Sequence, residues 1–250
     1  MWKSLSSIKN FLFIWIKNYS LRIIKNIYPF LFSFLFFWSS ETLQGQGFYR
    51  IKADFSIKEK TPDGKSQLII GKVYYDKTYK KVIYNIAFPE KETIVVTDSF
   101  MIRIIDSKVI DKKRSQNTNE FSVFHLCLNG NLSNFGLKNS PYTIENIEKE
   151  KDLVITTWMP PIDYRHLLGK ILLSQKEKKL FGLVLFNPKN IVVGKQFFKK
   201  YININGLEFP SEVIQITYAD KQEFYKITTF KNITVDDIRE DNIYNYPISH

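Results

Sequence analysis

The sequence contains very little cysteine and histidine. Among 250 residues there is one Cys, and there are three His, namely His125, His166 and His250. A single cysteine excludes a disulfide framework and any zinc or iron–sulfur site that needs several thiolates. None of the histidines stands in a metal-binding spacing such as H-E-x-x-H, so the sequence predicts no metal site.

The sequence also lacks the motifs of common enzyme classes. Asp63-Gly64-Lys65-Ser66 resembles the end of a phosphate-binding loop, but such a loop needs a glycine at position 59, which is Glu. No G-x-S-x-G nucleophile elbow occurs. Asp163-Tyr164-Arg165-His166 carries reactive groups, but neighbours on one loop or strand rarely converge on one substrate. We therefore expect no enzymatic activity, no catalytic residue and no cofactor.

Bases and aromatic residues, by contrast, are plentiful. The chain has 36 Lys and Arg against 25 Asp and Glu, a formal net charge of +11, and 16% of its residues are aromatic. The apolar fraction of 44% excludes a largely disordered chain, which would lack the apolar surface needed to offset the entropy of ordering. The charge alone leaves three alternatives open, namely nucleic acid, an anionic membrane surface, or no particular partner.

The N-terminal 47 residues have the pattern of a targeting segment. Residues 1–27 contain five bases and no acid, and Tyr28–Trp38 is an uncharged apolar run. A membrane-spanning helix needs roughly 20 apolar residues, whereas a shorter run behind a basic region is typical of a secretory signal. We predict that residues 1–47 are a signal peptide or an uncleaved anchor in the inner membrane; a buried core helix is the third alternative.

Export would place the remaining domain, residues 48–250, in the periplasm or elsewhere in the cell envelope. Removing residues 1–47 takes away five bases and one acid, so this domain carries a net charge of 31 − 24 = +7. An envelope location argues against nucleic acid and favours a membrane surface or an envelope protein as the partner.

From residue 48 onward, apolar and polar residues alternate as they do in half-buried strands. Ile51, Ala53, Phe55 and Ile57 are each followed by a polar residue, and turn dipeptides such as Asn205-Gly206 separate similar runs. The pattern predicts strands near 48–58, 66–76, 81–88, 94–96, 101–105, 108–113, 142–149, 152–158, 170–175, 180–186, 197–204, 212–219 and 223–230. Short strands separated by regular turns predict a mainly β domain, either a barrel or a sandwich.

Residues 122–138 have a different pattern. Their apolar residues are spaced more as in a helix and are interrupted by Gly130 and Gly136. The spacing predicts a short helix or an irregular helical segment. Cys127 lies in this segment without a disulfide partner, so we expect it to be a small buried apolar group.

Several strand sequences together resemble a known family. Between Ile51 and Asp106 the chain reads I-K-A-D-F-S-I-K, G-K-V-Y-Y-D-K-T, Y-N-I-A-F-P-E-K-E-T-I-V-V-T-D and I-R-I-I-D, and residues 227–235 read I-T-T-F-K-N-I-T-V. In order and spacing these segments resemble the periplasmic lipoprotein carriers, the LolA-like proteins with the LolA/LolB/RseB-type fold. The resemblance covers residues 48–113 and 207–248. It implies a half-open, strongly curved antiparallel β-barrel-like sheet with a few short helices on its concave side.

The resemblance also implies a function. The domain would be an outer-membrane lipoprotein chaperone or lipid carrier that holds lipoprotein acyl chains, or another lipid, non-covalently in an apolar concave pocket. The candidate lining residues lie on the apolar faces of the best-patterned strands: Phe55, Ile57, Tyr84, Ile86 and Phe88. Large inward side chains can equally fill a core. The alternative is therefore a non-enzymatic structural or interaction protein of the cell envelope that uses the same fold with a filled core.

Overall fold

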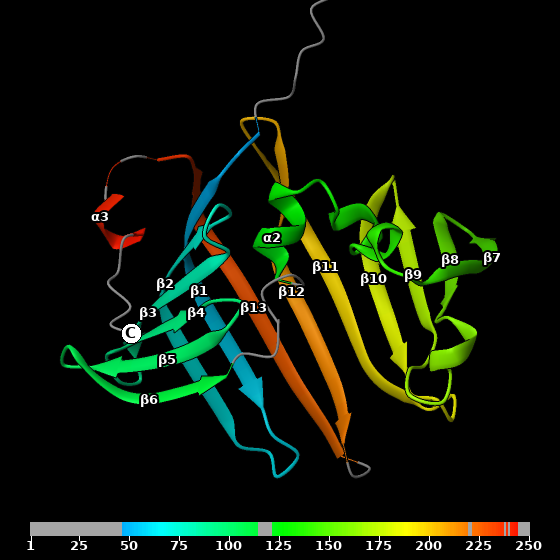
Figure 1. Ribbon diagram of the computed structural model, residues 1–250, viewed down its shortest axis with the longest axis horizontal. Coiled ribbons are helices and arrows are strands. Elements are labelled where there is room, and N and C mark those ends of the chain that lie inside the picture. Colours follow the sequence, from blue (N-terminus) through cyan, green and yellow to red (C-terminus); the bar gives the residue numbers. More distant parts are fainter. Residues whose placement is uncertain (1–46, 115–121, 220–221, 238, 240, 245–250) are drawn as a thin grey trace, which may run out of the picture. The chain divides into compact units, whose positions relative to one another are not determined.

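The computed structural model of the chain describes residues 47–114, 122–219, 222–237, 239 and 241–244 (Figure 1). Contacts unite residues 48–250 into one compact unit. The predicted signal peptide or anchor, residues 1–47, lies outside the described residues except for Gly47 and stays a prediction. Within the described part of the chain, no helix combines the length and the apolar character needed to cross a membrane.

Thirteen strands form a single antiparallel sheet, and each strand predicted from the alternating pattern is present. Their bounds are β1 Arg50–Lys60, β2 Ser66–Asp76, β3 Lys81–Phe88, β4 Glu92–Val96, β5 Phe100–Ile105, β6 Lys108–Arg114, β7 Thr143–Glu150, β8 Leu153–Met159, β9 Ile171–Lys176, β10 Lys179–Phe186, β11 Val192–Ile204, β12 Leu207–Ala219 and β13 Gln222–Val235. At the turn between β11 and β12, Asn205 and Gly206 both have positive φ, which matches the tight turn predicted there.

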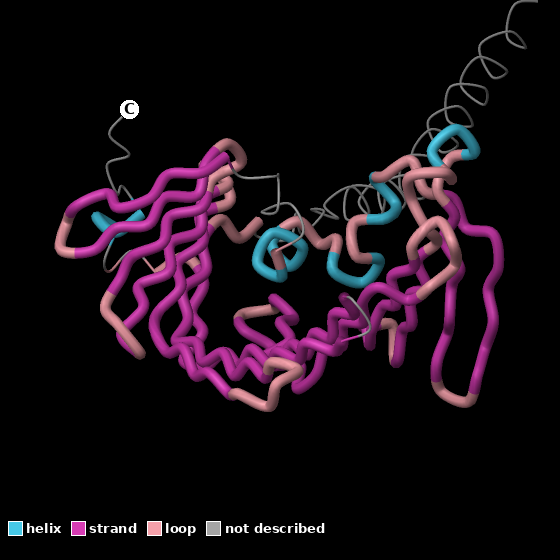
Figure 2. Tube along the Cα trace, turned by 90° about the horizontal axis from the view of Figure 1, so that it is seen from below, coloured by secondary structure: helices cyan, strands magenta, loops and turns pink. Residues whose placement is uncertain are grey.

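The sheet is strongly curved and remains open. The strand order is β6-β5-β4-β3-β2-β1-β13-β12-β11-β10-β9-β8-β7, so only the β1–β13 pair joins strands distant in sequence. Strands β6 and β7 are the two edges of the sheet among the described residues, and Figure 2 shows the sheet bent into a trough. The predicted half-open antiparallel sheet is thereby confirmed.

The segment between β6 and β7 supplies helices to the concave side of the trough (Figure 2). It contains α2 Val123–Leu128 and two 3-10 turns, η2 Leu132–Asn134 and η3 Leu137–Asn139, as predicted for residues 122–138. The Ser122 side chain accepts a hydrogen bond of 3.2 Å from the His125 N–H and so caps the start of α2. At the C-terminal end of α2, Lys77 Nζ donates a hydrogen bond of 3.0 Å to the Leu128 carbonyl.

Helix α2 packs its apolar face into one part of the trough. Phe124 is 2% exposed, and its ring centroid lies 5.2 Å from that of Phe230, 5.6 Å from that of Phe209 and 6.0 Å from that of Tyr75. Cys127 is buried in the same cluster, as expected. The main core of the domain therefore lies between α2 and the concave face of the sheet.

A second, smaller core lies on the convex face. Tyr74, Ile83 and Val95 point to this face and are covered by α3, Asp241–Tyr244, whose Tyr244 is 2% exposed. The ring of Tyr74 meets that of Tyr244 edge to face at 5.7 Å. The resemblance placed short helices on the concave side, and α3 is an addition on the opposite side.

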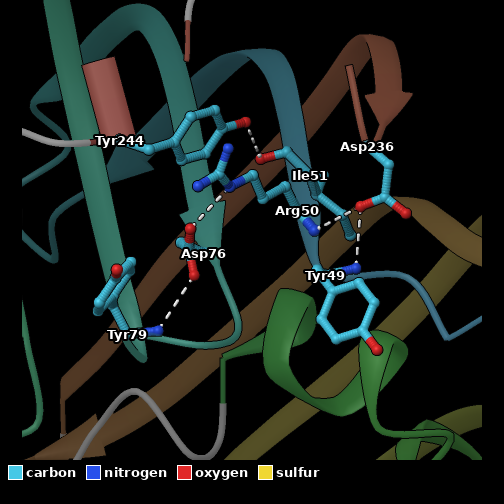
Figure 3. A network of polar contacts seen from close by, with 7 residues as sticks. All are labelled: Tyr49, Arg50, Ile51, Asp76, Tyr79, Asp236 and Tyr244. Atoms are coloured by element: carbon cyan, nitrogen blue, oxygen red, sulfur yellow. Dashed lines mark hydrogen bonds and ion pairs between the residues drawn. The ribbon is translucent and has the colours of Figure 1, made fainter. Parts of the chain in front are cut away.

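A polar network fastens the start of β1 to its neighbours (Figure 3). Arg50 Nε lies 2.7 Å from Oδ2 of Asp76, a carboxylate whose side chain is only 1% exposed, and the guanidinium lies 4.6 Å from the centre of the Tyr244 ring. Asp236 Oδ1 accepts hydrogen bonds of 2.9 Å from the backbone N–H groups of Tyr49 and Arg50. The network joins β1, β2 and the segment after β13.

Candidate functional site

The two ends of the trough differ in how completely they are filled, and we name them the packed rim and the open rim. Because neighbouring strands run in opposite directions, the connections of the sheet lie at two opposite rims. The rim that carries the turns 77–80 and 205–206 is called the packed rim. The rim that carries the connections 61–65, 89–91, 160–170 and 187–191 is called the open rim. In Figure 1 the arrowheads of β1, β10 and β12 point to the open rim, which is the lower one.

On β1 the concave side chains divide between the two ends. Ile51 and Ala53, near the packed rim, are buried in the main core. Phe55, Ile57 and Glu59, nearer the open rim, line a cavity of about 410 Å³. The start of α2 closes this cavity on its inner side. The trough is therefore filled at one end and hollow at the other.

Most of the cavity wall is apolar. Twelve apolar or aromatic residues line it: Phe55, Ile57, Ile69, Tyr84, Ile86, Ile94, Val96, Met101, Val123, Phe124, Val213 and Phe230. Six polar residues complete the wall: Glu59, Ser122, Gln196, Gln215, Lys226 and Thr228. The cavity lies within the size range of small-molecule sites, roughly 300–1,000 Å³, and has their usual mixture of an apolar wall and few polar groups.

Four of the polar lining residues form one row across the sheet on the side of the open rim. Gln196 is the register partner of Gln215, Gln215 is that of Lys226, and Lys226 is that of Glu59. Lys226 Nζ lies 3.6 Å from Glu59 Oε1, and the two side chains are 40% and 36% exposed. The partly exposed row marks the mouth of the cavity, and the next row inward on β12, β13 and β1 is Val213, Thr228 and Ile57.

The structure brings four of the five predicted lining residues together. Phe55, Ile57, Tyr84 and Ile86 all face the cavity from β1 and β3. The rings of Phe55 and Tyr84 meet edge to face, with centroids 5.6 Å apart. Loss of water contact raises the pKa of Tyr84 to about 12, as expected for a phenol that faces an apolar space.

Phe88 is the exception, because it does not line the cavity. The β2–β3 register shifts between Ile70 and Gly71, so that Gly71 pairs with Ile86 whereas Ile70 pairs with Phe88. Ala87 is thus the extra residue of a bulge, and the alternation of faces is interrupted there. Phe88 points to the convex face with Ile70; the two are 49% and 41% exposed.

Gly71 permits this bulge because a side chain would not fit there. A Cβ at position 71 would lie 2.2 Å from the Asn85 carbonyl oxygen. The absence of a side chain allows the two backbones to approach closely where β3 bends. Because the bulge depends on how β3 pairs with β2, the alternation of residues within β3 alone does not predict that Phe88 faces outward.

Sequence reasoning missed the lining residues of β12, β13 and α2. Phe230, Val213 and Val123 face the cavity although they lie at least 35 residues from the predicted set. The pairing of β1 with β13 brings Phe230 directly opposite Phe55. The resemblance of residues 227–235 to a closing strand was the one sequence signal that pointed to this face.

The described residues offer no metal site. No group of three or more His, Cys, Asp or Glu side chains within them could hold a metal ion. His125, which is partly buried, instead lies 2.7 Å through Nδ1 from the Tyr75 hydroxyl. Burial raises the pKa of the Cys127 thiol, which favours the protonated form at neutral pH.

No family profile matches the chain, and no curated protein is significantly similar to it in sequence. Solved structures do match. A LolA superfamily protein from Nitrosomonas europaea has a TM-score of 0.53 and 14% identity, over 78% of this chain and 90% of that protein.

Two further structures are similar over comparable lengths. A DUF1329 family protein from Desulfovibrio piger has a TM-score of 0.55 and 11% identity, over 80% of this chain and 91% of that protein. An outer membrane lipoprotein-sorting protein domain from Vibrio parahaemolyticus has a TM-score of 0.56 and 10% identity, over 80% of this chain and 91% of that domain. With its single open antiparallel sheet and helices in the trough, the chain has a LolA-like fold.

Proposed function

We propose that this protein is a non-enzymatic lipid carrier of the cell envelope that holds an acyl chain in the cavity at the open end of the trough. The observation that supports the proposal is the cavity itself, about 410 Å³ with twelve apolar lining residues, in a fold shared with a lipoprotein-sorting domain. A core filled along its whole length would favour the alternative, a structural or interaction protein. The hollow end favours the carrier.

Binding would depend on removing methylene groups from water. Each buried methylene contributes about 0.8 kcal/mol, so ten of them supply roughly 8 kcal/mol before the costs of ordering are subtracted. That gross energy sets micromolar affinity as the upper bound for a chain of this length, and the costs of association make the net affinity weaker. An affinity in this range would allow release without a covalent step.

The polar row at the mouth suits the other end of such a ligand. An acyl chain belongs to an amphiphile, and its polar group would emerge where Gln196, Gln215, Lys226 and Glu59 lie across the sheet. Lys226 could contact an anionic head group, and the two amides can donate or accept hydrogen bonds. The expected cargo is therefore a lipoprotein acyl chain or another lipid with a polar head.

The proposal is tested by lipid extraction and by titration. We expect the full-length protein, purified from its own envelope, to release lipid that mass spectrometry identifies, and to bind a fluorescent fatty acid.

Thr228→Trp fills the cavity with an apolar side chain and is expected to weaken probe binding about tenfold or more, because the ligand loses its burial. Tyr84→Lys, which places a charge on the apolar wall, is expected to have a similar effect.

Ile70→Trp is the matched control. It adds the same side chain to the convex face, where Ile70 is 41% exposed, and should leave probe binding unchanged. The proposal is wrong if Thr228→Trp and Tyr84→Lys fold, as judged by circular dichroism, and bind the probe like the parent protein. Absence of extracted lipid together with absence of probe binding would also contradict it.

A further inference from the structure

One loop on the open rim exposes apolar side chains over its whole length. In the β8–β9 connection all seven residues from Ile162 to Leu168 are exposed. Four of them are apolar or aromatic: Ile162 is 76% exposed, Tyr164 53%, Leu167 63% and Leu168 43%. Single exposed apolar residues are ordinary on a protein surface, whereas a contiguous group of this kind marks an interaction site.

The loop has a defined conformation that holds these side chains outward. It begins with the 3-10 turn η4, Ile162–Tyr164, and the Tyr164 carbonyl accepts hydrogen bonds from the N–H groups of Leu167, at 2.9 Å, and Leu168, at 2.8 Å. The Gly169 carbonyl accepts a hydrogen bond of 3.1 Å from the Tyr142 hydroxyl, which fastens the end of the loop. Exposure of the apolar residues is therefore a property of the folded loop.

The β10–β11 connection extends the same surface. A Cβ at Gly169 would lie 2.0 Å from the Phe186 carbonyl oxygen, so the two connections touch. The Phe186 N–H donates a hydrogen bond of 3.1 Å to the Lys170 carbonyl. Ile191, at the end of the second connection, is 57% exposed. The two connections, 160–170 and 187–191, are together called the rim patch.

The charges of the rim patch are mostly positive. It contains the bases Arg165, Lys170 and Lys189 and one acid, Asp163. Apolar residues and a tyrosine flanked by bases are the composition of segments that enter the interface of an anionic bilayer. A protein partner with an acidic surface could match the bases, but it would also need a pocket fitted to the outward aliphatic side chains, whereas a bilayer interface accepts them without one.

The position of the rim patch relates it to the cavity. Both lie at the open rim, because β8 and β10 end there with β1, whose Glu59 is in the row at the cavity mouth. Four strand spacings of about 4.8 Å separate β8 from β12, so the patch lies roughly 20 Å along the sheet from the mouth. A bilayer that touches the patch would face the rim at which the cavity opens.

We propose that the rim patch is a membrane-docking surface, in which Ile162, Tyr164, Leu167 and Leu168 enter the interface of an anionic bilayer and the neighbouring bases contact its head groups. The surface does not require that the cavity binds lipid, and it can be tested separately. If the cavity does bind an acyl chain, the same surface orients the mouth toward the membrane that donates or accepts it.

A fluorescent label can report the contact at a single position. In full-length Leu167→Cys a nitrobenzoxadiazole dye is attached to the new thiol; Cys127 is 5% exposed and its burial raises its pKa, so it stays unlabelled. With vesicles of phosphatidylethanolamine and phosphatidylglycerol we expect a blue shift and a rise in emission. Arg165→Gln with Lys189→Gln should raise the lipid concentration needed for the half-maximal response about tenfold, because each base near an anionic surface adds to the attraction.

Tyr79→Cys is the matched control at the opposite, packed rim. Tyr79 is 61% exposed and is also surrounded by lysines, at positions 77, 80 and 81, so it tests whether any exposed position near bases responds. The proposal holds if position 167 responds and position 79 does not. It is overturned if the two positions respond equally or if neither does, and equally if the response at 167 follows an added protein rather than the vesicles.

Failure of this experiment is distinguishable from failure of the carrier function. Thr228→Trp should abolish fatty-acid binding and leave the vesicle response at position 167 unchanged. Ile162→Asp with Leu168→Asp, introduced into the labelled Leu167→Cys protein, should do the reverse, because these side chains do not line the cavity.

Discussion

The two ends of the trough are built from the same strands and have opposite packing. At the packed rim Ile51, Ala53 and Tyr75 are at most 1% exposed and lie beneath α2. At the open rim Ile57 and Ile69 occupy the same face of β1 and β2, but they are only partly buried and border the cavity. The difference shows that alternation along a strand selects a face of the sheet and does not determine what covers it.

Helix α2 is the cause of the difference. It extends from the middle of the trough, where Val123 and Phe124 border the cavity, to Leu128, whose carbonyl is held by Lys77 at the packed rim. Its six residues cover one end only. The contribution of a side chain to stability should therefore differ along the length of the same strands, and three experiments measure contributions from the packed end.

The largest effect is expected from a truncation in the packed half. Phe124→Ala should lower the free energy of unfolding by about 3–5 kcal/mol, because it removes the ring that contacts Tyr75, Phe209 and Phe230. Ile57→Ala should cost about 2 kcal/mol, the low end for such a truncation, since this side chain already borders empty space. Denaturant unfolding of both variants gives the comparison, and equal losses would contradict the division of the trough.

The network at the packed rim should have the next largest effect. Asp76→Ala leaves Arg50 without the carboxylate that lies 2.7 Å from its Nε, and it removes the acceptor of the Tyr79 N–H. Breaking such a buried pair by removing one partner should cost about 3 kcal/mol in the free energy of unfolding. Asp63→Ala is the control: it breaks the exposed ion pair with Lys65 and should leave the unfolding midpoint of the parent protein unchanged. A similar midpoint for both variants would show that the network does not hold this end together.

The smallest effect concerns pH. Burial raises the pKa of Cys127 in the folded protein, whereas the unfolded chain should ionise this thiol near its ordinary pKa of about 8.5. Below that value the thiol adds no pH dependence, and above it ionisation favours the unfolded chain, so stability falls as the pH rises.

At pH 9.5 the loss attributable to this thiol should be about 1.4 kcal/mol. It is measured as the difference between the parent protein and Cys127→Ala, because buried tyrosines titrate in the same direction in both. A pH dependence that is identical in the two proteins would mean that Cys127 ionises as freely in the folded protein as in the unfolded chain.

Much of the fold could be predicted because it depends on local patterns. The alternation in residues 51–57 predicted β1, and the Asn205-Gly206 dipeptide predicted the turn between β11 and β12. The apolar run interrupted by glycines predicted the helical segment that contains α2 and two 3-10 turns. The bend of the sheet and its openness came from the resemblance. Neither follows from the alternation, which fits a barrel and a sandwich equally well.

The candidate site was predicted in part, and the reasons are specific. Phe55, Ile57, Tyr84 and Ile86 lie where alternation placed them, whereas Phe88 is turned outward by a bulge that exists only in the pairing of β3 with β2. The polar row at the mouth comes from β11, β12, β13 and β1, and no single strand reveals it.

The sequence by itself determined the strands, the turns and the apolar face, because each depends on neighbours along the chain and on the two-residue period of a strand. The tertiary structure alone decided that α2 covers one end of that face and that the other end is hollow. It also decided that β13 completes the wall and that the exposed loop 160–170 shares the rim of the cavity mouth. These features arise from pairings between distant residues, whose positions only the folded sheet defines.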